Sequence, residues 1–346
     1  MTLQQTLGSR WPLIQAPMAG VQGSALAIAV SNAGGLGSLP CAMLSADALR
    51  AELQRIQAET PEPYNVNFFC HRQPKADDAA EQRWRLALAP YYKEYGIDPD
   101  SIEAGAGRQS FDEAMADVLS EFEPPVVSFH FGLPEEPLLR RVKAWGATVL
   151  SSATTVDEAR WLEAHGVDVI IAQGVEAGGH RGMFLNDDLT QQMGTFALLP
   201  QVVASVQVPV IAAGGIADVS GIKAALALGA QGVQVGTAYM LCPEATTSAV
   251  HRSALVGPSA GHTALTNIFS GRPARGIVNR LMQEMGCISA VPPDFPLAAS
   301  ALAPLRAACE RRGKGDFSPL WAGQNASGCR ALPAAELTRE LVAAFS

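Results

Sequence analysis

The chain has 346 residues, of which 48% are hydrophobic and 17% charged, and its formal net charge is −8. This composition is typical of a globular protein with a large core and unlike that of a disordered chain. The negative charge argues against nucleic acid or an anionic membrane surface as the main partner.

Cysteine usage and the N-terminal stretch bear on the compartment. Six cysteines are scattered without a CxxC pair or metal-like spacing, so we expect reduced thiols, no bound metal and a cytoplasmic location. The opening MTLQQTLGSRWP lacks the basic-then-apolar order of a signal peptide. No charged residue lies between Arg10 and Asp47, but prolines, glycines and polar residues interrupt this stretch. We therefore interpret it as buried core and not as a membrane span.

Eight apolar, β-rich runs recur along the chain with helical patterns between them. We expect strands at 11–18, 35–40, 64–69, 126–132, 148–153, 167–173, 208–214 and 232–238. These runs are continuously apolar, which is typical of a parallel sheet covered on both faces. Helices are expected at 155–166 and 217–229, each with a capping residue near its start and a glycine at its end. The pattern predicts an α/β fold, a (β/α)8 TIM barrel, with a doubly wound open sheet as the alternative.

Two segments do not fit the period of the barrel. Residues 71–123 separate the third and fourth strands, and residues 246–346 follow the eighth. We expect this insertion after strand 3 and this C-terminal extension to form a smaller lid subdomain over the active end of the barrel. The barrel itself would then comprise 1–70 and 124–245.

Functional groups of a barrel gather at the carboxyl ends of its strands. Asn67 and Gln173 lie near the ends of the third and sixth predicted strands, His130 lies in the fourth, and His180 lies in the glycine-rich loop GVEAGGHRG. Glycines in AGGIAD after strand seven, and a Gly-Thr pair in QVGT, predict a phosphate site on backbone N–H groups. A phosphate there, with side-chain amides facing a planar ring across the barrel mouth, describes flavin mononucleotide (FMN).

The ordered set PLIQAPMAG, NFF, QGVEAGGHRG, PVIAAGGIAD and GVQVGTAYM resembles the nitronate monooxygenases, formerly called 2-nitropropane dioxygenases. TNIFSGRPARGIVNRL and KGDFSPLWAGQ extend the resemblance over nearly the whole chain, and the combination is similar to the bacterial class I enzymes. The resemblance implies an FMN-bearing barrel that oxidises nitronates, notably propionate 3-nitronate, with molecular oxygen to carbonyl compounds plus nitrite or nitrate.

The resemblance also implies roles for single residues. His180 matches the catalytic histidine of the family, and His130 lies where class I members have a second active-site histidine that binds substrate. The positions implied to contact the flavin are Pro17, Met18, Asn67, Gln173, Gly178, Gly179, Gly214, Gly215, Gln234, Val235, Gly236 and Thr237. For a neutral nitroalkane, a histidine whose pKa is near the operating pH is the expected base. For a substrate that is already a nitronate, His180 would only orient and hold the anion.

Several other polar residues are candidates with less defined roles. Lys314 is a candidate substrate-binding residue. The stretch APYYKEYG in the insertion supplies candidate lid or substrate contacts at Tyr91, Tyr92 and Tyr95. Arg272 and Arg275 either bind an anionic group or serve in packing.

Three alternative functions stay open. Two are reductases of the same superfamily, an FMN-dependent enoyl-acyl-carrier-protein reductase and an NADH:quinone reductase, which would use a reduced nicotinamide cofactor. The third is a non-catalytic barrel that binds a phosphate ligand. The expected partners are a small nitronate or nitroalkane and oxygen, with no nucleic acid or membrane, and the chain is expected to be a monomer or homodimer.

Overall fold

Eight parallel strands form one sheet in the order β1-β9-β8-β6-β5-β4-β3-β2. The structure is a computed structural model and describes residues 2–75, 77–102 and 108–345. A parallel bridge between Ile14 and Leu36 joins the two ends of the sheet, so the sheet closes on itself. The predicted (β/α)8 barrel is therefore confirmed.

Each predicted run contains one barrel strand. The strands are β1 (Leu13–Gln15), β2 (Gly37–Pro40), β3 (Tyr64–Phe69), β4 (Val126–His130), β5 (Thr148–Ala153), β6 (Val169–Gln173), β8 (Val210–Ala213) and β9 (Gly232–Val235). β3 and β5 have the predicted bounds, whereas the first strand is much shorter than 11–18. Pro12 and Pro17 flank it, and a proline has no N–H to donate to a neighbouring strand.

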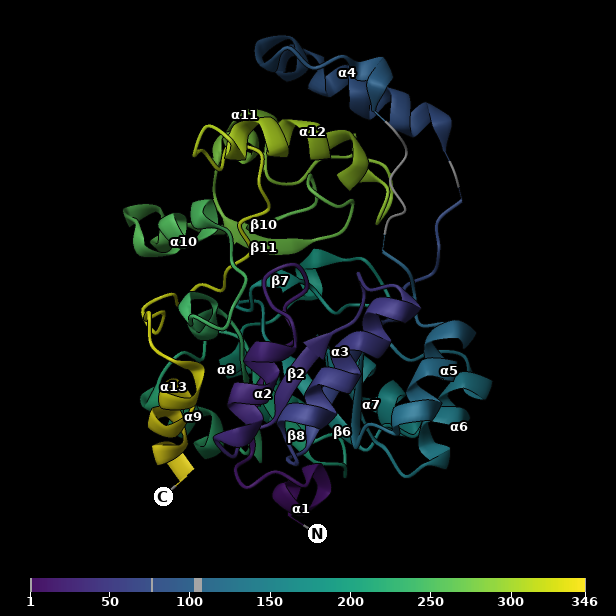
Figure 1. The fold of residues 1–346 in the computed structure, drawn as a ribbon, viewed down its shortest axis with the longest axis vertical. Coiled ribbons are helices and arrows are strands. Elements are labelled where there is room, and N and C mark those ends of the chain that lie inside the picture. The colour runs from purple at the N-terminus through teal and green to yellow at the C-terminus, as the bar shows by residue number, and fades with distance from the viewer. Residues whose placement is uncertain (1, 76, 103–107, 346) are drawn as a thin grey trace.

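Helices cover the outside of the barrel (Figure 1). They are α2 (Ser24–Asn32), α3 (Ala46–Glu59), α5 (Glu113–Phe122), α6 (Glu136–Ala144), α7 (Val156–Ala164), α8 (Thr195–Val203), α9 (Val219–Ala227) and α13 (Ala334–Leu341). α7 and α9 are the two helices expected from sequence. Thr155 and Asp218 cap them, because their side-chain oxygens accept hydrogen bonds from first-turn N–H groups. The short helix α1 (Leu3–Leu7) lies at the end of the barrel that is at the bottom of Figure 1, where its leucines pack with inward-facing strand residues.

Two of these helices come from the segments that were expected to form the lid. Met115 and Leu119 of α5 lie in the same buried cluster as the barrel strands, and so do Leu337 and Leu341 of α13. α13 contacts both α2 and α9. Each barrel strand needs apolar cover on its outer face, and α5 and α13 provide it. The part of the chain above the barrel is thus smaller than 71–123 plus 246–346.

The rest of the insertion and of the extension forms an outer layer over one end of the barrel, at the top of Figure 1. It contains α4 (Asp78–Tyr95), α10 (Ala249–Val256), α11 (Arg280–Met285), α12 (Ala298–Glu310) and the antiparallel strands β10 (Thr263–Thr266), β11 (Ala274–Ile277) and β7 (Gly179–His180). α4 of the insertion packs on α12 of the extension, and the Trp84 indole N–H donates to the Ala298 carbonyl at 3.0 Å. β7 belongs to the loop after β6 but pairs with β11. The loop that carries His180 is therefore bound to the outer layer by backbone pairing with β11.

Short 3-10 segments complete the described structure. They are η1 (Pro99–Ser101), η2 (Leu189–Gln191), η3 (Thr237–Leu241), η4 (Pro258–Gly261) and η5 (Val342–Phe345). Among the residues that the structure describes, no helix is both long enough and apolar enough to cross a membrane.

Candidate active site

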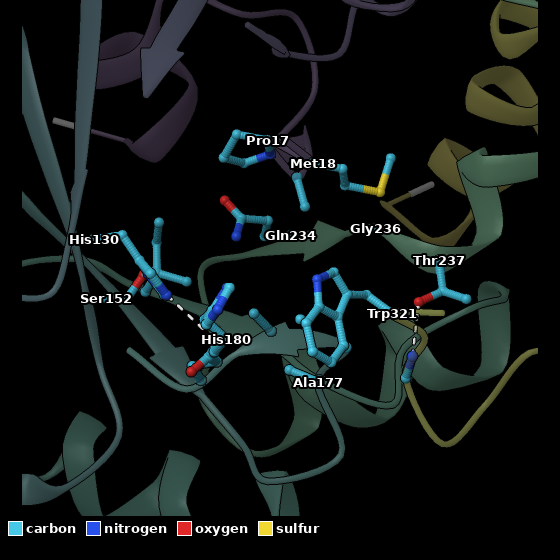
Figure 2. Close-up of a pocket in the computed structure, with 18 of the residues that line it drawn as sticks. Pro17, Met18, His130, Ser152, Ala177, His180, Gln234, Gly236, Thr237 and Trp321 are labelled. Carbon is cyan, nitrogen blue, oxygen red and sulfur yellow. Dashed lines mark hydrogen bonds between the residues drawn. The ribbon is translucent and has the colours of Figure 1, made fainter. Parts of the chain in front are cut away.

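A large pocket opens at the carboxyl ends of the barrel strands, beneath the outer layer. Its open space, including the solvent-filled mouth, is about 1240 Å³. His130 and His180 both line it, together with eleven of the twelve predicted flavin contacts: Pro17, Met18, Asn67, Gln173, Gly178, Gly179, Gly214, Gly215, Gln234, Gly236 and Thr237. Figure 2 shows several of them around one hollow. These thirteen predicted residues are nearly half of the 28 that line the pocket.

Two predicted site residues do not line this pocket. Val235 is fully buried in the cluster between the barrel and its helices. Successive side chains of a strand point to opposite faces, so Gln234 takes the pocket side and Val235 the helix side. Lys314 lies just after α12 and is exposed, and its backbone N–H donates to the Cys309 carbonyl at 3.2 Å. The structure therefore gives no support to a flavin contact at Val235 or a substrate contact at Lys314.

The residues whose roles were left open serve in packing. The tyrosines of the insertion lie in or against the buried cluster between α4 and α12: Tyr91, Tyr92 and Tyr95. The Arg275 Nε–H donates to the Val175 carbonyl at 2.8 Å. The Arg272 guanidinium lies over the Phe131 ring, 4.1 Å from its centre, and also donates to a backbone carbonyl. None of these five side chains reaches the pocket wall.

One part of the pocket wall is bare backbone. Gly214 follows β8 with φ +117°, and a Cβ there would lie only 2.9 Å from the Thr195 hydroxyl oxygen. Glycine is therefore required, and no side chain shields this turn. Thr237 begins η3 directly after β9, and its hydroxyl oxygen accepts the Gly323 N–H at 3.0 Å. Turns with unshielded N–H groups bind phosphate oxygens, so this part of the wall fits a phosphate.

Another part of the wall offers polar groups to a planar ring. The Gln234 side-chain oxygen is buried and has no hydrogen-bond partner among the described residues. A buried acceptor without a partner calls for a ligand donor, and a flavin ring carries such an N–H group. The Asn67 amide donates to the Ser128 hydroxyl at 2.9 Å, which fixes its side chain on the wall. Together with the bare backbone, these groups fit a flavin that carries a phosphate.

His180 lies in β7, opposite Ala274 of β11, and its side chain is buried. Four aromatic rings surround it at centre-to-centre distances of 5.2–6.3 Å: Phe69, Phe131, Phe295 and Trp321. Burial among these rings holds the pKa of His180 well below its ordinary value, and the nearby positive charge of Arg108 lowers that pKa further. The imidazole is therefore neutral at pH 7.

The hydrogen bonds around His180 assign its neutral tautomer. Its Nε2 lies 2.9 Å from the Ser270 hydroxyl oxygen, which in turn lies 3.2 Å from the Arg272 carbonyl. A carbonyl only accepts, so Ser270 donates to Arg272 and accepts the Nε2–H of His180. The lone pair is then on Nδ1, which has no hydrogen-bond partner among the described residues. His180 can accept a proton at Nδ1.

His130 supports the backbone of His180. Its Nε2–H donates to the His180 carbonyl at 3.2 Å, and its Nδ1 accepts from the Ser152 hydroxyl, with a separation of 3.1 Å (Figure 2). The Gln173 amide donates to the same carbonyl at 3.0 Å. Burial lowers the pKa of His130 to about 4. Since both of its ring nitrogens are engaged, His130 suits positioning better than direct binding of a substrate.

Sequence reasoning missed several residues that line the pocket or hold His180: Arg108, Ser152, Ser270, Phe295, Trp321 and Asn325. Trp321 and Ser270 stand within the quoted motifs KGDFSPLWAGQ and TNIFSGRPARGIVNRL, which were signals for them, and Ser152 lies in a predicted strand. Most of the others come from loops without periodicity, where no pattern marks a side chain as part of a site. Within the described ranges, no three His, Cys, Asp or Glu side chains gather closely enough to hold a metal ion.

Comparison with known proteins gives a consistent family. A family model described as nitronate monooxygenase matches residues 2–344. A nitronate monooxygenase of Pseudomonas aeruginosa is 47% identical over 97% of this chain and 96% of its own length. One from Paraburkholderia phytofirmans is 46% identical over 97% of this chain and 92% of its own.

Solved structures agree with this result. A nitroalkane oxidase from Streptomyces ansochromogenes has a TM-score of 0.88 and 39% sequence identity, covering 99% of this chain and 97% of that one. FabK from Thermotoga maritima covers 99% of this chain and 95% of its own, but with a TM-score of 0.72 and 28% identity. The FabK structure is thus the more distant of the two.

Proposed function

The chain belongs to the nitronate monooxygenase family, and from that premise we propose that it uses FMN to oxidise alkyl nitronates, with propionate 3-nitronate as its expected substrate. The family membership makes it a flavin-dependent oxidoreductase. The products expected from oxygen and a nitronate are a carbonyl compound with nitrite or nitrate. His180, neutral and walled by aromatic rings within the flavin-compatible pocket, is the observation that carries this proposal.

FMN is proposed over other flavins because the wall fits one phosphate next to one ring system. The bare turns at 214–215 and 236–237 would hold the phosphate, and Gln234 would accept a hydrogen bond from the ring. Pro17 and Met18 line the pocket near Gln234 in Figure 2 and would pack against the ring. When bound, the flavin supplies the electron transfer between substrate and oxygen.

The protein's own contribution centres on His180. With a neutral nitroalkane, Nδ1 of His180 would take the α-proton, while Nε2–H stays bonded to Ser270. A base whose pKa is low is weaker but is unprotonated at neutral pH. With a nitronate no proton need move, and the ring would only orient the anion. The aromatic rings around His180 would keep water from the reacting carbon.

Three further proposals concern the cover of the site, the location of the protein and its partners. The outer layer of α4, α11 and α12 would act as the cover of the substrate site, because it holds β7 through β11. All six cysteines are free, which fits the reducing cytoplasm. A small nitro compound and oxygen would be the partners of the enzyme.

Anaerobic mixing of the purified protein with candidate reductants tests the function. We expect a yellow protein whose released cofactor has the mass of FMN. Propionate 3-nitronate should reduce the flavin quickly and support oxygen uptake without a nicotinamide cofactor. Rapid bleaching by NADH or NADPH together with no response to any nitronate would instead favour the reductases. A colourless protein that takes up no flavin would favour a non-catalytic barrel.

A further inference from the structure

The histidines near the pocket are uncharged, so they offer no positive charge to an anionic nitronate. His71, His130 and His180 stand near the pocket, and burial lowers the pKa of each, to about 4 for His71 and His130. All three imidazoles are uncharged at pH 7, so none of them supplies a positive charge to an anion. A cation must come from another side chain.

Two arginines lie close enough to His180 to lower its pKa, Arg108 and Arg272. Arg272 also has a buried Nε without a hydrogen-bond partner among the described residues, but its guanidinium already lies 4.1 Å from the centre of the Phe131 ring and donates to the Met183 carbonyl. It is not among the residues that line the pocket, whereas Arg108 is. Among the described residues, Arg108 is therefore the Lys or Arg side chain that a substrate in the pocket can reach.

Arg108 has no anionic partner of its own. Among the described residues no carboxylate forms an ion pair with it, and its buried Nε has no hydrogen-bond partner. Burial lowers the pKa of its guanidinium, and the positive charge of Arg306 lowers it further. A partly buried cation without a counter-charge is costly, and a bound anion would remove that cost.

The position of Arg108 suits a short substrate that carries a polar group at each end. Its guanidinium carbon lies 5.7 Å from the centre of the Phe295 ring. The same ring centre lies 5.2 Å from that of His180. Arg108 and His180 both line the pocket and both lie beside Phe295, so one short molecule in the pocket can meet the guanidinium at one end and the imidazole at the other. A guanidinium binds a carboxylate through two parallel hydrogen bonds.

We propose that Arg108 determines specificity by binding the carboxylate of substrates that carry both a carboxylate and a nitronate, while the nitro-bearing carbon faces His180. This inference rests on the proposed function. It assigns the choice between carboxylated and simple alkyl nitronates to one side chain from the insertion after β3, and it gives Arg108 no part in the electron transfer.

The test compares two nitronates that differ only at the far end. Propionate 3-nitronate has a carboxylate where propyl-1-nitronate has a methyl group. We expect Arg108→Gln to raise KM for propionate 3-nitronate about 10- to 100-fold with a smaller change in kcat. KM for propyl-1-nitronate should change less than about 2-fold, and Arg108→Lys should restore part of the loss because it restores the charge.

A binding measurement without turnover gives a second readout. Succinate has two carboxylates at the same spacing as the carboxylate and nitro groups of propionate 3-nitronate. It should bind the wild-type holoenzyme in calorimetry, and Arg108→Gln should weaken that binding by a similar factor. Arg306→Gln is the matched control, since it removes an exposed cation near Arg108 that already pairs with Glu310, and it should leave succinate binding within about 2-fold.

The outcomes separate this inference from the proposed function. If the wild-type protein oxidises neither nitronate, the proposed function is wrong. If it oxidises both and Arg108→Gln slows both equally, or neither, then Arg108 does not select the carboxylate. Thermal unfolding of each variant shows whether it is folded. If Arg108→Gln fails to fold, the ratio of KM for the two nitronates in Arg108→Lys decides whether Arg108 selects the carboxylate.

Discussion

Burial at His180 separates two roles that the sequence had combined in one side chain. A histidine with a pKa near 7 could either take a proton or hold an anion by its charge. The aromatic rings around His180 favour the uncharged imidazole. It can then accept a proton at Nδ1 but cannot supply a positive charge, and that role passes to Arg108.

Replacement of the ring tests the proton transfer. We expect His180→Asn to lower kcat/KM for neutral nitroethane about 10²- to 10⁴-fold, the range typical of the loss of a general base. The loss should be much smaller for ethyl nitronate, because that substrate has already lost its α-proton. Oxygen uptake with nitroethane, and with ethyl nitronate prepared in advance, measures both values.

The same substitution at an exposed histidine serves as the control. His262 lies on the surface just before β10, so His262→Asn should leave both values unchanged. Equal losses for the two substrates in His180→Asn would show that the residue holds or orients the substrate and does not act as the base.

At the scale of elements, the loop after β6 and the segment 321–325 form one unit of the pocket wall. The Gly323 N–H donates to the Thr237 hydroxyl oxygen at the start of η3, and the Gln324 N–H donates to the Glu176 carbonyl in the β6 loop at 3.0 Å. The segment therefore connects two barrel loops across the flavin-compatible wall. Gly178 lies at their contact, where a Cβ would be 2.5 Å from the Gly323 nitrogen and 2.6 Å from the Ala322 carbonyl carbon.

This contact predicts that Gly178→Ala disturbs flavin binding. The added methyl group would meet backbone on a different segment, so the segment 321–325 must move away from the loop. We expect the variant to unfold at a lower temperature, with a cost of ~1–3 kcal/mol from overpacking, and to bind the flavin at least 10-fold more weakly. Fluorescence titration of the flavin-free protein with FMN measures the affinity.

Gly261→Ala is a suitable comparison for Gly178→Ala. A Cβ at Gly261 would meet nothing within 4 Å, and the backbone there is not left-handed. It should change neither the unfolding temperature nor the affinity for FMN by a measurable amount. A Gly178→Ala protein with wild-type flavin affinity would mean that this contact does not shape the cofactor site.

The sequence predicted the barrel elements well because their signals are local. Continuous apolar runs identified all eight strands, and alternation within β9 explains why Gln234 lines the pocket while Val235 does not. The twelve predicted flavin contacts included Val235 because the resemblance marks a stretch of chain, not the direction of each side chain. Gly178 was also predicted as a flavin contact, but its packing against Gly323, 145 positions later, leaves no local trace.

At the scale of the whole molecule, the unpredicted part of the site comes from segments far apart in the chain. Arg108 from the insertion and Phe295 from the extension meet in front of the barrel, and the packing of α4 on α12 helps to bring the two segments together. Neither α4 nor α12 carries a sequence motif that indicates which helix it packs against. Such contacts depend on the complete core, so sequence periodicity could not reveal them.

The same burial predicts how stability depends on pH. His71, His130 and His251 each have a pKa lowered to about 4 in the folded chain, mainly through burial. Their ordinary value is 6.5, so the unfolded chain binds more protons between pH 6.5 and 4. Stability should thus be fully present above pH 6.5 and fall as the pH drops through this window. Each histidine contributes up to about 1.4 kcal/mol per pH unit.

Urea unfolding of the FMN-saturated protein at several pH values from 7.5 to 4.5 measures this slope, and His251 isolates one contribution. His251 lies outside the pocket, and its Nε2–H donates to the Trp321 carbonyl at 3.0 Å. His251→Gln keeps a donor but removes the titration, so its free energy of unfolding should fall less steeply below pH 6.5. The exposed His262→Gln should follow the wild-type curve. Parallel curves for wild type and His251→Gln would mean that carboxylates, which lose their charge at lower pH, cause the acid instability instead.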